Sequence, residues 1–187
     1  RGATRETWFA STRMLHRVGV LDSPLATMTG HGYHVYDSLV RVTLVVSGYA
    51  GLRTGEVIGD QVRQIDIAPT ILDLAGLADE IPTTVQGRSL ETLIDGGTLE
   101  HIPAFIETCQ NSREPSDIYG VRYQGWKYAY DASNPKVAQE LYDLSSDPHE
   151  THNLAETNPQ KTAELRALIE KHLSQAQTGG VALTNDL

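Results

Sequence analysis

The sequence has a single cysteine, Cys109, among its 187 residues. One thiol cannot build an internal disulfide framework, and it leaves the cellular compartment unknown. Long apolar runs are also missing, because no stretch approaches the roughly 20 residues that a membrane-spanning helix needs. No signal peptide is visible, since the opening "RGATRETW" carries charge without an apolar core behind it. We therefore expect a soluble protein without a membrane partner.

Positive charge is scarce. Lysine and arginine total 15 against 24 aspartates and glutamates, which gives a net charge of −9 and a pI near 5.1. This balance argues against nucleic acid as a partner and against adhesion to anionic membranes, because phosphate would be repelled. The 40% of hydrophobic residues is enough for a globular core. The chain begins with Arg1 rather than Met, and we expect it to be a partial or processed chain.

The first half of the chain predicts helices and one strand. Residues 4–18 place apolar side chains at helical spacing, and Gly19 follows as a stop. Residues 41–47 contain "VTLVV", which is short, β-branched and apolar on both faces, and this predicts a buried strand. One such strand cannot make a doubly wound sheet, so the α/β part of the protein is expected to be incomplete.

Two further helices are predicted before residue 100. In "QIDIAPTILDLAGL" we expect Asp66 to cap the first turn and Gly76 to end the helix. The predicted buried stripe of this helix consists of Ile67, Ile71, Leu72 and Leu74. A short helix over residues 89–95 is expected to end at the glycine pair that follows it.

The pattern of apolar and polar residues changes after residue 101. The runs "PAFIETC", "IYGVRYQGWKYAY" and "QELYDL" predict a small antiparallel sheet, with the middle run bent at Gln124-Gly125. Asn158 and Pro159 then begin a last helix whose apolar stripe is Leu165, Leu168, Ile169 and Leu173. We divide the chain into residues 1–100, the end of an α/β domain; residues 101–176, a small α+β subdomain; and residues 177–187, a loose tail.

Three blocks of sequence resemble the sulfatase family. They are "YDSLVRVTLVVSGY", "VRQIDIAPTILDLAGL" with the later "QGRSLETLIDG", and "GVRYQGWKYAYD" with the later "QELYDLSSDPHETHNLA". They follow the family's order and cover most of residues 35–155. The resemblance implies the C-terminal part of an alkaline-phosphatase-like mixed sheet with helices, plus a small antiparallel sheet closed by a helix.

The resemblance also implies an activity. Sulfatases hydrolyse sulfuric esters with a formylglycine nucleophile, and a divalent cation, usually Ca²⁺, binds the sulfate and stabilises charge on its oxygens. Histidine and lysine side chains orient the sulfate and protonate the leaving oxygen. The partner of a complete enzyme would be a sulfate ester, either a small molecule or a carbohydrate. The natural substrate is not readable from these residues.

The family's nucleophile motif, Cys-x-Pro-Ser-Arg, and its first metal motif are missing. The stretch from Cys109 to Arg113 has cysteine, serine and arginine at the right offsets, but Asn111 stands in place of proline. It also falls in a predicted C-terminal strand, far from where the family keeps its nucleophile. We expect Cys109 to be a strand residue beside a polar turn.

The stretch "MTGHGYHVYD" resembles the place where the family carries a second metal carboxylate and a catalytic lysine. This chain has Gly30 and Tyr33 at those positions. Hard cations such as Ca²⁺ need six to eight oxygen ligands, which His31 and His34 do not supply. We therefore expect no Ca²⁺ on this chain alone. His34 remains the candidate catalytic residue, and His31 a weaker candidate for a metal ligand.

Other polar residues have simpler interpretations. Asp37 and Arg41 are expected to serve a local turn or an ion pair ahead of the predicted strand, and Arg88 a turn. Arg122 and Lys127 alternate with apolar residues, as in a half-buried sheet, although their cations could also face an anionic substrate. Asp143, Asp147, Glu150 and His152 predict a loop capped by carboxylates rather than a metal site.

Three functions stay open. The chain can be the C-terminal portion of a sulfatase that is inactive alone, a degenerate sulfatase-like module that binds without turnover, or part of a phosphoester or phosphonate hydrolase of the same superfamily. The first and third differ at the nucleophile, which this chain does not contain. Marginal stability is also expected, because a partial sheet would expose apolar surface.

Overall fold

The structure is a computed structural model that describes residues 34–48, 51–53, 55–109 and 117–179. The predicted helix over residues 4–18, His31 and the Asn111–Arg113 stretch lie outside these residues. The chain divides into two compact units, one formed by residues 1–42 and 105–187 and the other by residues 43–104. The domain boundaries expected from the sequence remain a prediction. Each unit is described by itself below.

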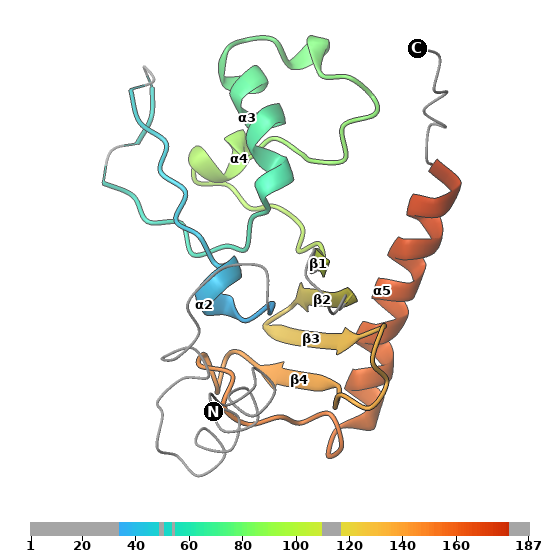
Figure 1. Ribbon diagram of the computed structural model, residues 1–187. Coiled ribbons are helices and arrows are strands. Elements are labelled where there is room, and N and C mark those ends of the chain that lie inside the picture. Colours follow the sequence, from blue (N-terminus) through green and yellow to red (C-terminus); the bar gives the residue numbers. More distant parts are fainter. Residues whose placement is uncertain (1–33, 49–50, 54, 110–116, 180–187) are drawn as a thin grey trace, which may run out of the picture. The chain divides into compact units, whose positions relative to one another are not determined.

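Unit 1 is built on a four-stranded sheet in the order β1-β2-β3-β4 (Figure 1). The strands are β1 (Ala104–Cys109), β2 (Asp117–Tyr123), β3 (Trp126–Asp131) and β4 (Glu140–Asp143). Strand β3 pairs antiparallel with both β2 and β4. The predicted small antiparallel sheet is therefore confirmed, and Cys109 is the last residue of its first strand.

The bend predicted in the middle run is a two-residue hairpin turn. Tyr123 pairs with Trp126, and the two residues between them, Gln124 and Gly125, have φ angles of 50° and 79°. Two successive positive φ angles define the turn type whose twist matches that of the flanking strands. Glycine adopts this conformation without steric cost, which explains why the bend falls at Gly125.

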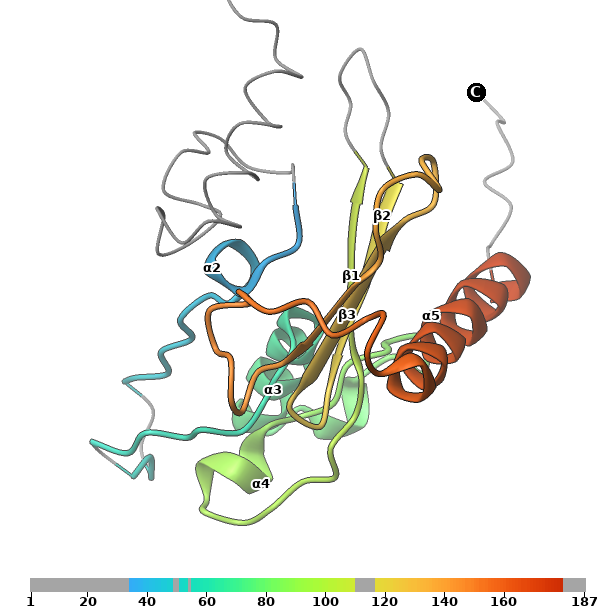
Figure 2. The same cartoon turned by 90° about the horizontal axis from the view of Figure 1, so that it is seen from below.

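One face of the sheet is covered by α5 (Pro159–Gly179), as Figure 2 shows. The helix begins as predicted, because the side-chain oxygen of Asn158 accepts the backbone N–H of Lys161 at 3.2 Å. The buried core of the unit consists of Val121, Tyr128, Leu141, Leu165 and Ile169, with Leu168 and Leu173 packed against it. The predicted apolar stripe of this helix is thus confirmed.

Within the part of the chain that the structure describes, none of the helices combines the length and the apolar character that a membrane span needs.

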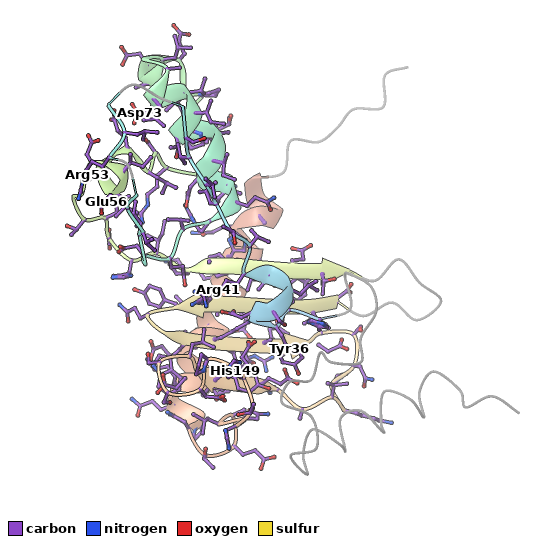
Figure 3. The ribbon with its side chains drawn as sticks, turned by 90° about the vertical axis from the view of Figure 1, so that its left-hand side faces the viewer. Tyr36, Arg41, Arg53, Glu56, Asp73 and His149 are labelled. Atoms are coloured by element: carbon purple, nitrogen blue, oxygen red, sulfur yellow. The ribbon has the colours of Figure 1, made fainter. Side chains whose placement is uncertain are left out.

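The opposite face of the sheet carries the short helix α2 (Asp37–Val40), seen in front of the strands in Figure 3. Because side chains alternate along a strand, this face is formed by the neighbours of the core residues. Gly120 and Arg122 of β2 flank the core residue Val121, and Lys127 of β3 precedes Tyr128. The sheet therefore has an apolar face toward α5 and a mixed face that holds α2.

Unit 2 contains short helices joined by loops. They are η1 (Gln64–Asp66), α3 (Ile67–Leu74), η2 (Ala78–Glu80) and α4 (Glu91–Ile94). Gly76 ends α3 with a φ of 74°, and the glycine pair after α4 begins with Gly96 at 86°, so both predicted stops are confirmed. The predicted stripe of α3 is wrong at Ile71, which is 61% exposed.

Asp66 does not cap α3 as predicted. Its carboxylate, in a residue that is 1% exposed, instead accepts the backbone N–H of Arg63 at 2.9 Å and that of Arg88 at 3.0 Å. The Arg63 guanidinium adds bonds of 3.2 Å and 2.7 Å. Burial raises the pKa of Asp66, but the hydrogen bonds from Arg63 and Arg88 outweigh it and leave this pKa below its ordinary value of 3.8. The buried carboxylate joins the start of η1 to the turn before α4.

The predicted buried strand over residues 41–47 is wrong. These residues form no strand and are exposed, with Val42 at 74% and Val45 at 76%. The sequence has the composition of a buried strand, but a strand also needs a neighbour with which to pair its backbone. Among the described residues, the sheet of unit 1 contains only β1 to β4, and none of them pairs with this segment.

Candidate functional site: a buried ion cluster beside His34

The segment from His34 to Asp37 lies against the mixed face of the sheet. The Val35 side chain packs directly against Gly120. A Cβ atom added to Gly120 would lie 3.4 Å from Val35 Cγ2, so the glycine leaves room for this side chain. The Tyr36 hydroxyl donates to Glu140 Oε1 at 2.9 Å, and its ring lies edge-on to Tyr142, with 6.3 Å between the ring centroids. Contacts to β2 and β4 thus fix the approach to α2.

The Lys127 side chain is the centre of a buried ion cluster. Its ammonium Nζ lies 2.9 Å from Asp37 Oδ1 and 2.7 Å from Glu150 Oε1, and the side chain is only 2% exposed. Arg122 adds a second cation, with Nη1 2.9 Å from Asp37 Oδ2. Burying a lone ammonium would cost several kcal/mol, so two carboxylates are what makes this position tolerable.

Glu150 reaches the cluster from the loop after β4, at a residue with a φ of 56°. Its second oxygen, Oε2, accepts the backbone N–H of Asp37 at 2.7 Å. This bond uses a free N–H at the start of α2, where a negative charge is also favoured. Burial raises the pKa of Glu150 despite the opposing attraction of Lys127. The carboxylate is therefore partly destabilised in its charged form.

His34 is 8% exposed and precedes the cluster by three residues. Its Nδ1 accepts the backbone N–H of Tyr36 at 3.3 Å, and the two rings lie tilted at a centroid distance of 5.1 Å. Burial, and secondarily the charge of Lys127, lowers the pKa of His34 below its ordinary value of 6.5. An Nδ1 that accepts a hydrogen bond places the proton of the neutral ring on Nε2.

The structure brings together residues that the sequence had separated. The ion-pair interpretation of Asp37 is confirmed, whereas Lys127 is fully buried instead of half-buried. The sequence predicts that Glu150 belongs to the capped loop, but its carboxylate lies 2.7 Å from the Lys127 ammonium. The alternation of apolar and charged residues around Lys127 indicates which face of the sheet this side chain lies on. It does not indicate Asp37, a partner 90 residues away along the chain.

The remaining polar candidates have structural roles. Asp143 binds Ser145 and Ser146, and Asp147 binds the backbone of Thr151 and His152, so the prediction of a capped loop is confirmed for these two carboxylates. The backbone N–H of Arg88 binds Asp66 and its guanidinium binds the carbonyl of Glu100 at 2.6 Å, as expected of a turn residue. Arg41 is exposed beside α2, opposite Tyr36 in Figure 3.

A metal ion does not fit the part of the chain that the structure describes. No group of three or more histidine, cysteine, aspartate or glutamate side chains is arranged there to hold one. Asp37 and Glu150 are already neutralised by Lys127 and Arg122, so their oxygens are not available as the ligands that Ca²⁺ needs.

The fold and this segment define a class of protein. A family model described as N-sulphoglucosamine sulphohydrolase, C-terminal, matches residues 31–179. The match includes His34, the ion cluster and all four strands, and it extends over most of the chain. The chain belongs to the sulfatase family, as a C-terminal domain.

Individual relatives agree with this assignment. Arylsulfatase K from Mus musculus is 29% identical over 170 residues, which cover 81% of this chain and 30% of the relative. N-acetylglucosamine-6-O-sulfatase from Bacteroides thetaiotaomicron is 27% identical and covers 86% of this chain and 32% of its own length. The solved structure of a 2-O GAG sulfatase is 29% identical, with a TM-score of 0.53 over 60% of this chain and 24% of the other.

The likeness confirms the predicted fold class, helices with a small antiparallel sheet as in the C-terminal part of sulfatases. The chain spans about a quarter to a third of the length of these relatives.

Proposed function

We propose that this chain is the C-terminal portion of a sulfuric ester hydrolase and has no turnover by itself. The observation that carries the proposal is the match of the C-terminal family model to residues 31–179. The sequence supplies no Cys-x-Pro-Ser-Arg motif, and the nearest approximation, at Cys109, has Asn111 in place of proline. In the complete enzyme, the formylglycine and the ligands of Ca²⁺ would thus come from residues outside this chain.

The exposed segment 41–47 supports the same proposal. Its apolar side chains include Val42, Leu44, Val45 and Val46, which are between 42% and 76% exposed. Exposed apolar residues in an extended segment are typical of a strand that has lost its neighbours. We propose that the segment joins the sheet of the larger α/β domain in the complete enzyme.

His34 is the residue that we propose to face the sulfate ester. It lies next to the cluster on the segment that resembles the family's metal and lysine positions, and its neutral ring keeps a proton on Nε2. A neutral imidazole can donate that proton as a hydrogen bond to a sulfate or leaving-group oxygen. The relatives named for sulfated sugars, an N-acetylglucosamine-6-O-sulfatase and a 2-O GAG sulfatase, favour a carbohydrate sulfate as the substrate.

A second candidate function is a degenerate module that binds without turnover. Gly30 and Tyr33, where the family carries a carboxylate and a lysine, favour it. A phosphoester or phosphonate hydrolase of the same superfamily is a third candidate, and an upstream threonine or serine nucleophile would distinguish it.

We expect the purified chain to release no product from a chromogenic aryl sulfate, with or without added Ca²⁺, because it lacks the nucleophile motif. Absorbance assays over hours at high protein concentration would detect even slow turnover. The His34→Ala variant is the matched control. A calcium-dependent rate that disappears in this variant would contradict the proposal that the chain is inactive alone.

A further inference from the structure

We propose that Lys127 is a positioning residue, which acts from the C-terminal sheet on the segment that carries His34 and fixes the imidazole in its place. The proposal rests on the proposed function in one respect, the assignment of His34 to the substrate side. It would give the C-terminal sheet a part in preparing the site, in addition to closing the fold.

The geometry of the segment supports this role. Three consecutive residues bind the sheet, since Val35 packs beside Gly120, Tyr36 donates to Glu140 and Asp37 binds the Lys127 ammonium. Glu150 holds the backbone N–H of Asp37 while its other oxygen contacts the same ammonium. Lys127 therefore holds Asp37, the first residue of α2, in two ways. Its ammonium binds the Asp37 carboxylate, and it also binds the Glu150 carboxylate, which accepts the Asp37 backbone N–H. The imidazole lies three residues before this anchor.

The electrostatics of the site act in the same direction. Within the described part of the chain, the charged or titratable groups around His34 are Tyr36 beside it, Asp37 on α2, Arg122 on β2, Lys127 on β3, Glu140 and Tyr142 on β4, and Glu150 on the following loop. Of these, it is Lys127 whose charge lowers the pKa of His34 in addition to burial. Protonation of Nδ1 would also break the hydrogen bond from the Tyr36 N–H. Both the backbone and the buried ammonium thus oppose an imidazolium.

The test is a pH titration of His34 by NMR, followed at its ring Cε1–H signal in the 187-residue chain. Loss of that signal in His34→Gln assigns it. The double variant Lys127→Met/Glu150→Gln removes the ammonium together with one of its carboxylates, which avoids leaving an extra unpaired charge. We expect the titration midpoint of His34 to rise in this variant, because Lys127 is the charged group that lowers this pKa and its removal outweighs the loss of the Glu150 charge. An unchanged or lower midpoint would overturn the proposal.

Two further variants make the result specific. Lys161→Met removes a cation on the α5 side of the sheet, where Nζ contacts Glu164 at 2.7 Å, and should leave the midpoint unchanged. The single variant Glu150→Gln keeps Lys127 but removes a compensating charge, so the midpoint should fall. Unfolding would instead move it toward the ordinary value of 6.5. If the double variant fails to fold, Glu150→Gln decides, and a midpoint that does not fall refutes the role of Lys127. Turnover is not needed, so failure of the proposed function is a separate result.

Discussion

Replacing Lys127 by methionine is expected to destabilise unit 1 by about 3–5 kcal/mol, the usual cost of breaking a buried ion pair from one side. The methionine side chain fills the space, but Asp37 and Glu150 then lose the ammonium that lies within 2.9 Å of both. Arg122 still compensates Asp37, whereas the Glu150 carboxylate keeps, among the residues that the structure describes, the backbone N–H of Asp37 alone. Urea unfolding followed by circular dichroism would measure the loss.

The matched controls separate charge from packing. Lys161→Met removes the half-buried partner of the exposed Glu164 and should cost within about 1 kcal/mol, as ion pairs at the surface usually do. Lys127→Met combined with Glu150→Gln should be more stable than Lys127→Met alone, because the second change removes the stranded carboxylate. Equal stability of the single and double variants would show that the loss comes from packing, and the importance of the buried charges would be refuted.

Asp66→Ala is expected to destabilise unit 2 by about 2–4 kcal/mol, because buried donors that lose a charged acceptor keep their desolvation cost. The backbone N–H groups of Arg63 and Arg88 and the Arg63 guanidinium all donate to this carboxylate. Hydrogen exchange at the amides of Arg63 and Arg88 would report the loss locally. Asp79→Ala, at an exposed aspartate of η2, is the control and should change neither exchange nor stability appreciably.

The same carboxylate should make the stability of unit 2 depend on acid. The pKa of Asp66 in the folded chain lies below its ordinary value of 3.8, so its stabilising contribution is complete above that value and is lost as the pH falls through the lower folded pKa. In Asp66→Asn this part of the acid dependence should disappear. Identical acid unfolding of the two proteins would contradict the assignment.

The sequence predicted well where neighbours along the chain determine the structure. The hairpin at Gln124-Gly125, the start of α5 at Asn158 and the stop at Gly76 each depend on residues within one turn, and all three are confirmed. The alternation in β2 and β3 predicted a half-buried sheet, and α5 covers one face of it. Local preference and tertiary packing agree at these places.

Prediction failed where a residue depends on a distant partner. The segment 41–47 has the composition of a buried strand, but no described strand pairs with it, and composition says nothing of whether a neighbour is present. Asp66 was expected to cap its own helix, yet Arg88, 22 residues later, competes for the carboxylate. Lys127 and Asp37 are 90 residues apart, so no local pattern could indicate their ion pair. The role of His34 remains a prediction, and its titration is therefore an informative experiment.

The bond from the Asp37 N–H to Glu150 spans 113 positions of the chain, so it holds together segments that a cut in the polypeptide would separate. Residues 43–104 lie along the chain between two segments of unit 1, the segment with α2 before them and strand β1 after them. A single cut within residues 43–104 would divide the chain in two. The piece that contains residues 34–42 would still be held to the sheet through the buried charges. Truncation before β1, in contrast, would strip one face of the sheet of its cover and leave Lys127 beside Glu150 alone. A C-terminal module cut from this chain therefore has to include the segment from His34 to Val40, and a boundary drawn at the first strand would omit that segment.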